Sequence, residues 1–191
     1  MPTNQILTKQ QFDGIIQALA VSLTGLDPNS GVRIGWQEDG SPGWDIGTDQ
    51  VFMRSTLEPD PVTQQRDIEY GQDVGDGIHV QVTESYVRVR AVQFDVYGPN
   101  AEETAQAILD CLYLDSTTQT LAASNLAFIP EDYYIEWAPE LFAGQFWQVG
   151  HFRVRFNESV ILYTNVPYLE TAQIIIEAET SGGLFEEEIA P

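Results

Sequence analysis

The feature that most constrains the fold is a long segment near the middle of the chain, which runs from Tyr86 to Tyr97 without a glycine or a proline. Its alternation of apolar and polar residues predicts a β-strand with a buried face. The apolar positions change parity along the segment, from Val87, Val89 and Ala91 to Val92, Phe94 and Val96. This change predicts either a bulge near Ala91 or a strand whose two ends are covered on opposite faces.

Further strands are predicted on both sides of this segment. They lie at residues 32–36, 79–83, 133–137, 145–156, 160–163 and 172–178. Pro139 is expected to end the strand at 133–137, because proline cannot donate a ladder hydrogen bond. The many strands, with helices before and between them, predict an α+β fold with an antiparallel, possibly mixed and twisted, sheet.

Two main helices are expected to pack on that sheet. Thr8 and Gln11 fit a capping box ahead of an apolar stripe of helical spacing, and Gly25 is placed to end the helix. A second helix is expected to begin with Asn100 as its N-cap, and it carries an apolar face that runs to Leu112. A shorter helical piece is expected at 117–124.

The length of 191 residues fits a single domain over residues 1–191. Residues 37–78 are rich in glycine, proline and carboxylates, which predicts a loop-rich insertion or arm with little core of its own. Within it, residues 67–70 could form a brief edge strand. Residues 180–191 are expected to form an acidic C-terminal tail.

The charge of the chain excludes several classes of partner. Asp and Glu number 29 against 8 Lys and Arg, for a formal net charge of −21, and Lys9 is the only lysine. Such a surface repels phosphate, which argues against nucleic-acid binding by charge neutralisation and against binding to an anionic membrane. The hydrophobic fraction of 43% is too high for a disordered chain.

Few residues suggest catalysis. His79 and His151 lie in predicted strands, the lone Cys111 lies in a predicted helix, and no nucleophile elbow or phosphate-binding loop is present. We therefore predict no catalytic residue, no cofactor and no metal site. A small hydrolase that uses His79 or His151 with a carboxylate remains an alternative.

The arginines are the candidate functional residues. Arg88 and Arg90 share one face of the central strand, and Arg153 and Arg155 share one face of a late strand. These pairs suggest that a sheet face meets acidic neighbours. The neighbours are either carboxylates of the same chain or those of another subunit, since arginine is favoured at interfaces. We list all four as candidate subunit-interface residues.

The segment VQFDVYGPNA at 92–101, followed by a helix with the pattern AxxIxxxL, resembles the neck or tail-terminator proteins of tailed bacteriophages. The late segment QFWQVGHFRVRFNESV at 145–160 agrees, and the resemblance covers residues 5–25 and 78–178. It implies a structural virion protein and not an enzyme. Such subunits form a hexameric ring that closes the tail tube and joins it to the head-connector or stopper proteins, and DNA passes through the ring.

The resemblance also implies assembly in the host cytoplasm, and the charge of the chain predicts no membrane partner. Other functions remain open at this point. The chain could be another head-to-tail connector or baseplate component, or an acidic binding protein that mimics DNA.

Overall fold

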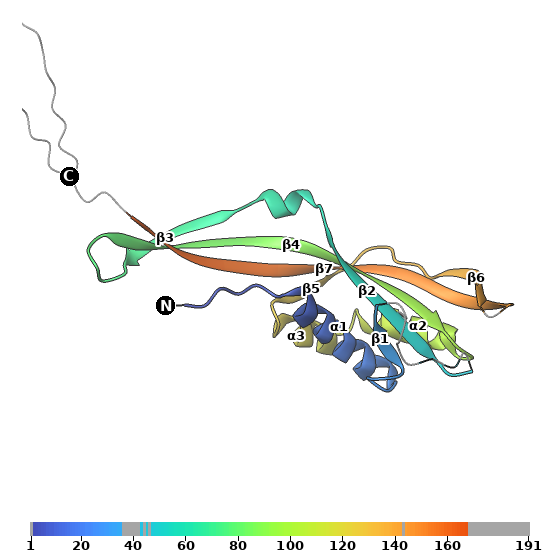
Figure 1. The fold of residues 1–191 in the computed structure, drawn as a ribbon. Helices are drawn as coiled ribbons and strands as arrows, with labels where there is room; N and C mark the ends of the chain where they lie inside the picture. The colour runs from blue at the N-terminus through green and yellow to red at the C-terminus, as the bar shows by residue number, and fades with distance from the viewer. Residues whose placement is uncertain (1, 36–42, 44, 46, 143, 168–191) are drawn as a thin grey trace, which may run out of the picture.

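The computed structural model describes residues 2–35, 43, 45, 47–142 and 144–167, and shows the predicted α+β fold (Figure 1). Its elements follow this order: α1 (Lys9–Thr24), β1 (Val32–Ile34), β2 (Gln50–Glu58), the 3-10 helix η1 (Pro61–Gln64), β3 (Asp67–Asp73), β4 (His79–Tyr97), α2 (Ala101–Cys111), α3 (Asp115–Ala122), β5 (Leu126–Ile129), β6 (Glu136–Phe142) and β7 (Gln145–Pro167).

The strands form one mixed, seven-stranded sheet built around β4 and β7. These two strands pair antiparallel in one unbroken register from His79 opposite Pro167 to Val96 opposite Gly150. On the other side of β4, β2 and β3 lie end to end, with η1 between them. The strand order is β1-β2-β4-β7-β5, β6 also pairs with β7, and only the pair β1–β2 is parallel.

The unbroken register excludes the bulge predicted near Ala91. Ala91 faces Thr56 on one side and Arg155 on the other, without a shift in either ladder. The other alternative, two ends covered on opposite faces, is not what the structure shows either, since both faces of the strand are buried over the same stretch, 89–97. Ala91 and Val92 are 1% and 0% exposed, although neighbouring residues point to opposite faces.

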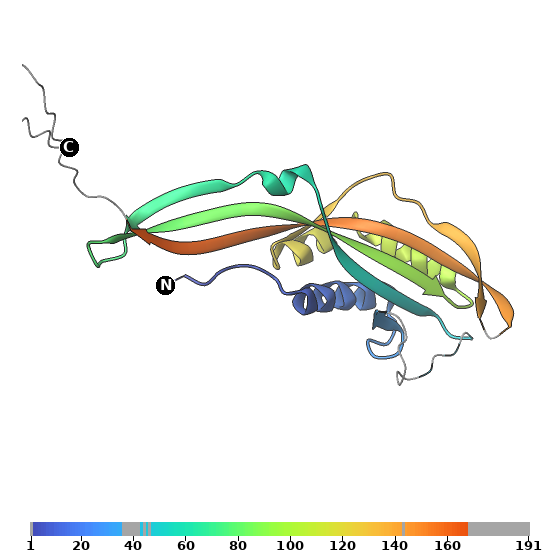
Figure 2. The ribbon, with the colours of Figure 1, turned by 45° about the horizontal axis from the view of Figure 1, so that its top comes forward.

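Helices α1, α2 and α3 all lie against one face of the sheet (Figures 1 and 2). The main core joins apolar side chains of α1, α2, β4 and β7, among them Phe12, Ile16, Phe94, Ile108 and Phe156. The N-terminal capping box of α1 is confirmed, and Gly25 ends the helix with a left-handed φ of 70°. The first helix therefore follows from its local sequence alone.

Two local predictions at helix and strand ends were wrong in part or in full. Asn100 is the N-cap residue of α2, as predicted, but its side chain makes no capping hydrogen bond, and its amide donates to Asp49 Oδ2 at 2.9 Å instead. Pro139 does not end a strand but lies inside β6, opposite Gln148. The strand tolerates it because β6 pairs with β7 alone, and an edge strand has one row of backbone groups outside the ladder.

The region predicted as a loop-rich insertion contains an internal strand. Residues 50–58 form β2, which pairs with β1 and β4 and buries Val51, Phe52 and Met53. The expectation of little core at 37–78 was therefore wrong for this part. The edge strand expected at 67–70 is present as β3. The predicted strand at 172–178 and the acidic tail at 180–191 lie outside the described residues.

One end of the sheet extends well beyond the helices. We call this part the arm; it consists of β3 with residues 79–88 of β4 and 158–167 of β7. Figures 1 and 2 show the arm at the left, with the helices beneath the other half of the sheet. At about 3.3 Å per residue, the arm portion of β4 is about 33 Å long.

Among the described residues, no helix is long and apolar enough to cross a membrane.

Candidate subunit interface

The two arginine pairs lie on opposite faces of the sheet. Arg90 pairs in register with Phe156, whose side chain belongs to the core beneath the helices. Arg155 pairs with Ala91 and points to the face away from the helices. The expectation that the pairs mark a single face was wrong, because the register between β4 and β7 places even-numbered residues opposite even-numbered ones.

Arg88 and Arg90 share one buried carboxylate of their own chain. Glu158 is 0% exposed, and its Oε2 accepts from the Nε atoms of Arg88 and Arg90, both at 2.7 Å. Its Oε1 accepts from Arg88 Nη2 at 2.6 Å and from the Leu7 backbone N–H at 2.9 Å. Both Nη2 atoms also donate to the Leu7 carbonyl. This buried triad therefore ties the segment before α1 to the sheet.

The environment of Glu158 favours its charged form. Burial raises the pKa of this carboxyl, but the hydrogen bonds from Arg88, Arg90 and the Leu7 N–H outweigh burial, so that the net pKa is lowered. The Arg90 guanidinium also lies 4.9 Å from the centre of the Phe12 ring, a cation–π geometry. Arg90 itself is 4% exposed and has almost no surface to offer another molecule.

Arg153 and Arg155 pair with carboxylates on the opposite face. Arg155 contacts Glu58, Asp60 and Glu131 at 2.7, 2.5 and 2.6 Å. Arg153 contacts Glu58 at 2.5 Å, and its side chain stays 54% exposed. Burial lowers the pKa of Arg155, but the hydrogen bonds to Glu131, Asp60 and Glu58 outweigh it and raise the net value.

All four arginines thus pair with carboxylates of the same chain, which is one of the two alternatives raised by the sequence. Their part in a contact between subunits stays a prediction. Of the four, Arg153 has the most exposed side chain in an ion pair.

The two histidines also contact carboxylates. His79 Nδ1 lies 2.7 Å from Asp76 Oδ2 in the turn between β3 and β4. The backbone N–H groups of Ile78 and His79 and the His79 ring form hydrogen bonds with Asp76, and these lower the pKa of Asp76 to about 2. His151 Nδ1 lies 2.6 Å from Asp95 Oδ1, and its Nε2 faces Glu140 at 3.6 Å. Both ring nitrogens of His151 therefore lie near carboxylates.

A cavity of about 250 Å³ opens beside His151, on the face away from the helices. It is lined by Gln93, Asp132, Tyr133, Tyr134, Glu136, His151, Phe152 and Arg153. Burial raises the pKa of Tyr133 to about 12. Within the described part of the chain, no three His, Cys, Asp or Glu side chains are grouped so as to hold a metal ion.

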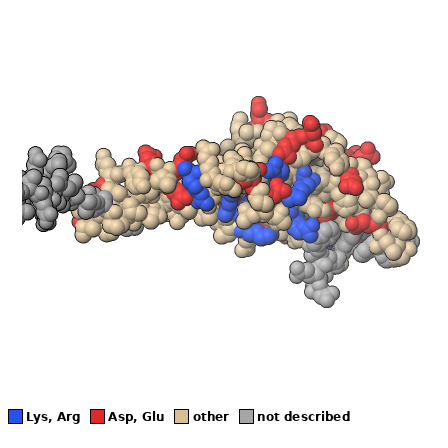
Figure 3. Space-filling model, turned by 90° about the horizontal axis from the view of Figure 1, so that it is seen from above, with Lys and Arg blue, Asp and Glu red and all other residues tan. Residues whose placement is uncertain are grey.

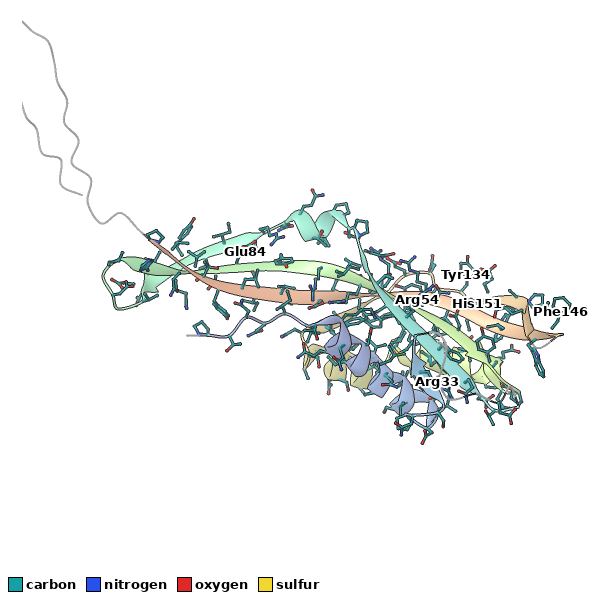
Figure 4. The ribbon with its side chains drawn as sticks, in the orientation of Figure 1. Arg33, Arg54, Glu84, Tyr134, Phe146 and His151 are labelled. Carbon is teal, nitrogen blue, oxygen red and sulfur yellow. The ribbon has the colours of Figure 1, made fainter. Side chains whose placement is uncertain are left out.

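Large apolar side chains are exposed mainly in two regions. Those around the arm and η1 are Leu57, Val62, Ile68, Tyr70, Val74 and Ile78, and those near β6 are Tyr134, Leu141 and Phe146. Figure 4 shows Tyr134 and His151 on the side of the sheet away from the helices, Phe146 at the tip of the β6–β7 hairpin and Glu84 on the arm. Apolar side chains gathered in this way are typical of surfaces that contact other proteins.

Sequence analysis missed Glu158, although the sequence contains a signal for it. Phe152, Val154, Phe156, Glu158 and Val160 share one parity, so the alternation places a carboxylate on the buried face. A charge at such a position needs a buried partner, and the paired arginines of the neighbouring strand supply it.

The fold and these clusters define an α+β protein in which Arg88, Arg90, Arg153 and Arg155 form ion pairs between segments of the sheet. A family profile described as phage neck terminator protein matches residues 11–182. The chain therefore belongs to the family of phage neck terminator proteins, which gives it a structural role as a component of the virion neck. Comparison with curated proteins found no match.

Proposed function

We propose that this protein forms a ring, most simply a hexamer, that closes the tail tube and joins it to the head-connector proteins. The observation that carries the proposal is the family match, which spans nearly the whole chain. In this proposal the subunits fold in the host cytoplasm and join the virion there, and DNA passes through the ring without being specifically bound.

The charge of the chain supports the part of the proposal that concerns DNA. Each subunit carries a formal charge of −21, so a six-fold ring carries 6 × −21 = −126. A channel lined by carboxylates repels phosphate, and DNA can slide through it without adhering. The same charge opposes self-association, so the subunit contacts need apolar area and local pairing of opposite charges.

The ring is tested by light scattering coupled to size-exclusion chromatography, and by negative-stain microscopy of the purified protein. We expect a ring with a central hole, and we expect purified tail tubes to bind it at one end. Binding to a head-connector protein without binding to tube ends would favour a different connector role.

Duplex DNA is the second reagent. We expect no mobility shift of DNA even at low salt, where electrostatic attraction is strongest. A strict monomer that binds basic nucleic-acid enzymes with a steep salt dependence would instead favour a DNA mimic and refute the ring.

A further inference from the structure

The underside of the arm is an uncovered continuation of the face that the helices cover elsewhere. Val92 and Phe94 of β4 point to the helices, and Val82 has the same parity on the same strand. Tyr70 pairs with Val82, and Ile68 is two residues away, so both lie on this face of the arm. Their exposed fractions are 71% and 56%.

The charge of the arm limits where it can dock. Residues 67–87 include Asp67, Glu69, Asp73, Asp76 and Glu84 but no lysine or arginine, and Arg66, just before them, pairs with Glu84. Most of the surface of another copy is also acidic and repels the arm. The repulsion is smallest where arginines offset the carboxylates, and on the face that Figure 3 shows the basic side chains lie over the middle of the molecule.

The cavity beside His151 is lined by Arg153 as well as by the carboxylates Asp132 and Glu136. Its volume of about 250 Å³ is large enough for one aromatic side chain, and Tyr133 and Tyr134 are the tyrosines among its lining residues. A phenol hydroxyl that enters it can donate to Glu136 or accept from Arg153. The cavity thus combines apolar contact with hydrogen-bonding groups, as anchor pockets for tyrosine do.

We infer that the arm of one subunit lies across this face of the next subunit and inserts Tyr70 into the cavity. The inference rests on the proposed ring and names the surfaces that build it. Tyr70 pairs with Val82, and His151 pairs with Asp95, 13 residues further along β4. At about 3.3 Å per residue the two sites lie about 43 Å apart, so one chain cannot bring them together.

The contact therefore joins two different surfaces, which is the kind of contact that closes into a ring when its rotation permits. A buried aromatic side chain contributes about 150–250 Å². Tyr70 and Ile68 on one side, with Tyr134 on the other, thus supply several hundred of the roughly 800 Å² per partner that a stable interface needs. The side chains along the rest of the arm supply the remainder.

Chemical cross-linking tests the contact. Cys111, the only cysteine, is first replaced by serine. The double variant Tyr70→Cys with Tyr134→Cys is then treated with a short bis-maleimide reagent. We expect a ladder of covalent oligomers that ends at the size of the ring. The matched control combines Tyr70→Cys with Leu114→Cys, because Leu114 is also exposed, at 49%, but lies at the junction of α2 and α3.

A mixture of the two single variants separates this contact from a symmetric one. Tyr70→Cys mixed with Tyr134→Cys is expected to give cross-linked dimers, and each single variant alone is expected to give none. Two further variants avoid the cysteines. Tyr70→Ala is expected to raise the protein concentration at which the ring dissociates into monomers by at least tenfold. Phe146→Ala, at an aromatic side chain of similar exposure, is expected to leave that concentration unchanged.

The outcomes separate the two proposals. Rings that form normally but give no ladder, or a ladder equally strong in the Leu114 control, overturn the assignment of the arm and leave the ring standing. A wild-type chain that stays monomeric at every concentration and on tail tubes overturns both.

Discussion

Replacing Glu158 by glutamine tests whether the buried triad at the base of the arm is held by charge. The variant Glu158→Gln keeps the size of the side chain but removes its charge and one of its two acceptor atoms. Arg90, which is 4% exposed, then keeps a buried positive charge without its counter-ion. Breaking one partner of a buried ion pair costs about 3–5 kcal/mol. The Arg88 side chain is 16% exposed, and some contact with water favours the lower end, about 3 kcal/mol.

The assay is urea unfolding of both proteins at one protein concentration, followed by tryptophan fluorescence. We expect the midpoint to fall with little change in slope. Glu84→Gln is the control, because Glu84 pairs with Arg66 at 2.6 Å on the surface, where the two side chains are 37% and 43% exposed. That change should cost less than about 1 kcal/mol. If Glu158→Gln and Glu84→Gln lost equally small amounts of free energy of unfolding, the reasoning would be refuted.

A triple variant separates lost attraction from an unpaired charge. Arg88→Met, Arg90→Met and Glu158→Leu together remove every charge of the triad and fill the space with apolar atoms. Such replacements are often neutral or stabilising. We therefore expect the triple variant to be at least as stable as the wild type, and far more stable than Glu158→Gln. Hydrogen exchange should nevertheless rise at Leu7, whose N–H donates to Glu158.

Further predictions concern pH and local geometry. The folded-state pKa of Glu158 is lowered from its ordinary value of 4.5, so the stability that this carboxylate contributes is present above about pH 4.5 and is lost as the pH falls through the folded-state pKa. The difference in free energy of unfolding between the wild type and Glu158→Gln, measured by urea titration, should therefore narrow from pH 7 to pH 3. Gly98→Ala should cost about 2–3 kcal/mol in thermal unfolding, because Gly98 has a φ of +118° and a Cβ there would lie 2.6 Å from Asp49 Cα. Gly14→Ala, inside α1 with nothing within 4 Å of the new Cβ, should instead stabilise by about 0.5–1 kcal/mol. Thr8→Ala removes the cap of α1 and should lower the free energy of unfolding by about 1 kcal/mol. Hydrogen exchange should be faster at the Gln11 N–H, which donates to Thr8 Oγ1 in the wild type.

The parts of the fold that were predictable are those set by neighbours in sequence. The capping box at Thr8, the stop at Gly25 and the uninterrupted strand at 86–97 each depend on residues a few positions apart. β2 escaped prediction because its apolar run at 51–53 is short and its stability comes from pairing with β4, about forty residues away. The role of Pro139 also depended on a non-local fact, namely that β6 is an edge strand.

The candidate site shows the same division. The parity of Arg88 with Arg90 and of Arg153 with Arg155 follows from strand geometry alone. Which pair points to which face depends on the register of β4 against β7, and no local signal fixes that register. The carboxylate partners Glu58 and Glu131 come from segments far from the arginines in sequence, and they are brought close only by the completed sheet.

The unbroken pairing of β4 with β7 has a mechanical consequence. The two strands act as a beam that is held in the helix-covered core and projects as the arm, with the N-terminal segment bonded to β7 at Ile161 and Tyr163. A slip of one residue would break every ladder bond and turn each side chain to the wrong face, so the beam can bend or twist but not slide. Arg88 and Glu158 face each other in register where the beam leaves its clamp. A load at the arm's tip therefore reaches this ion pair before it reaches the hydrophobic core.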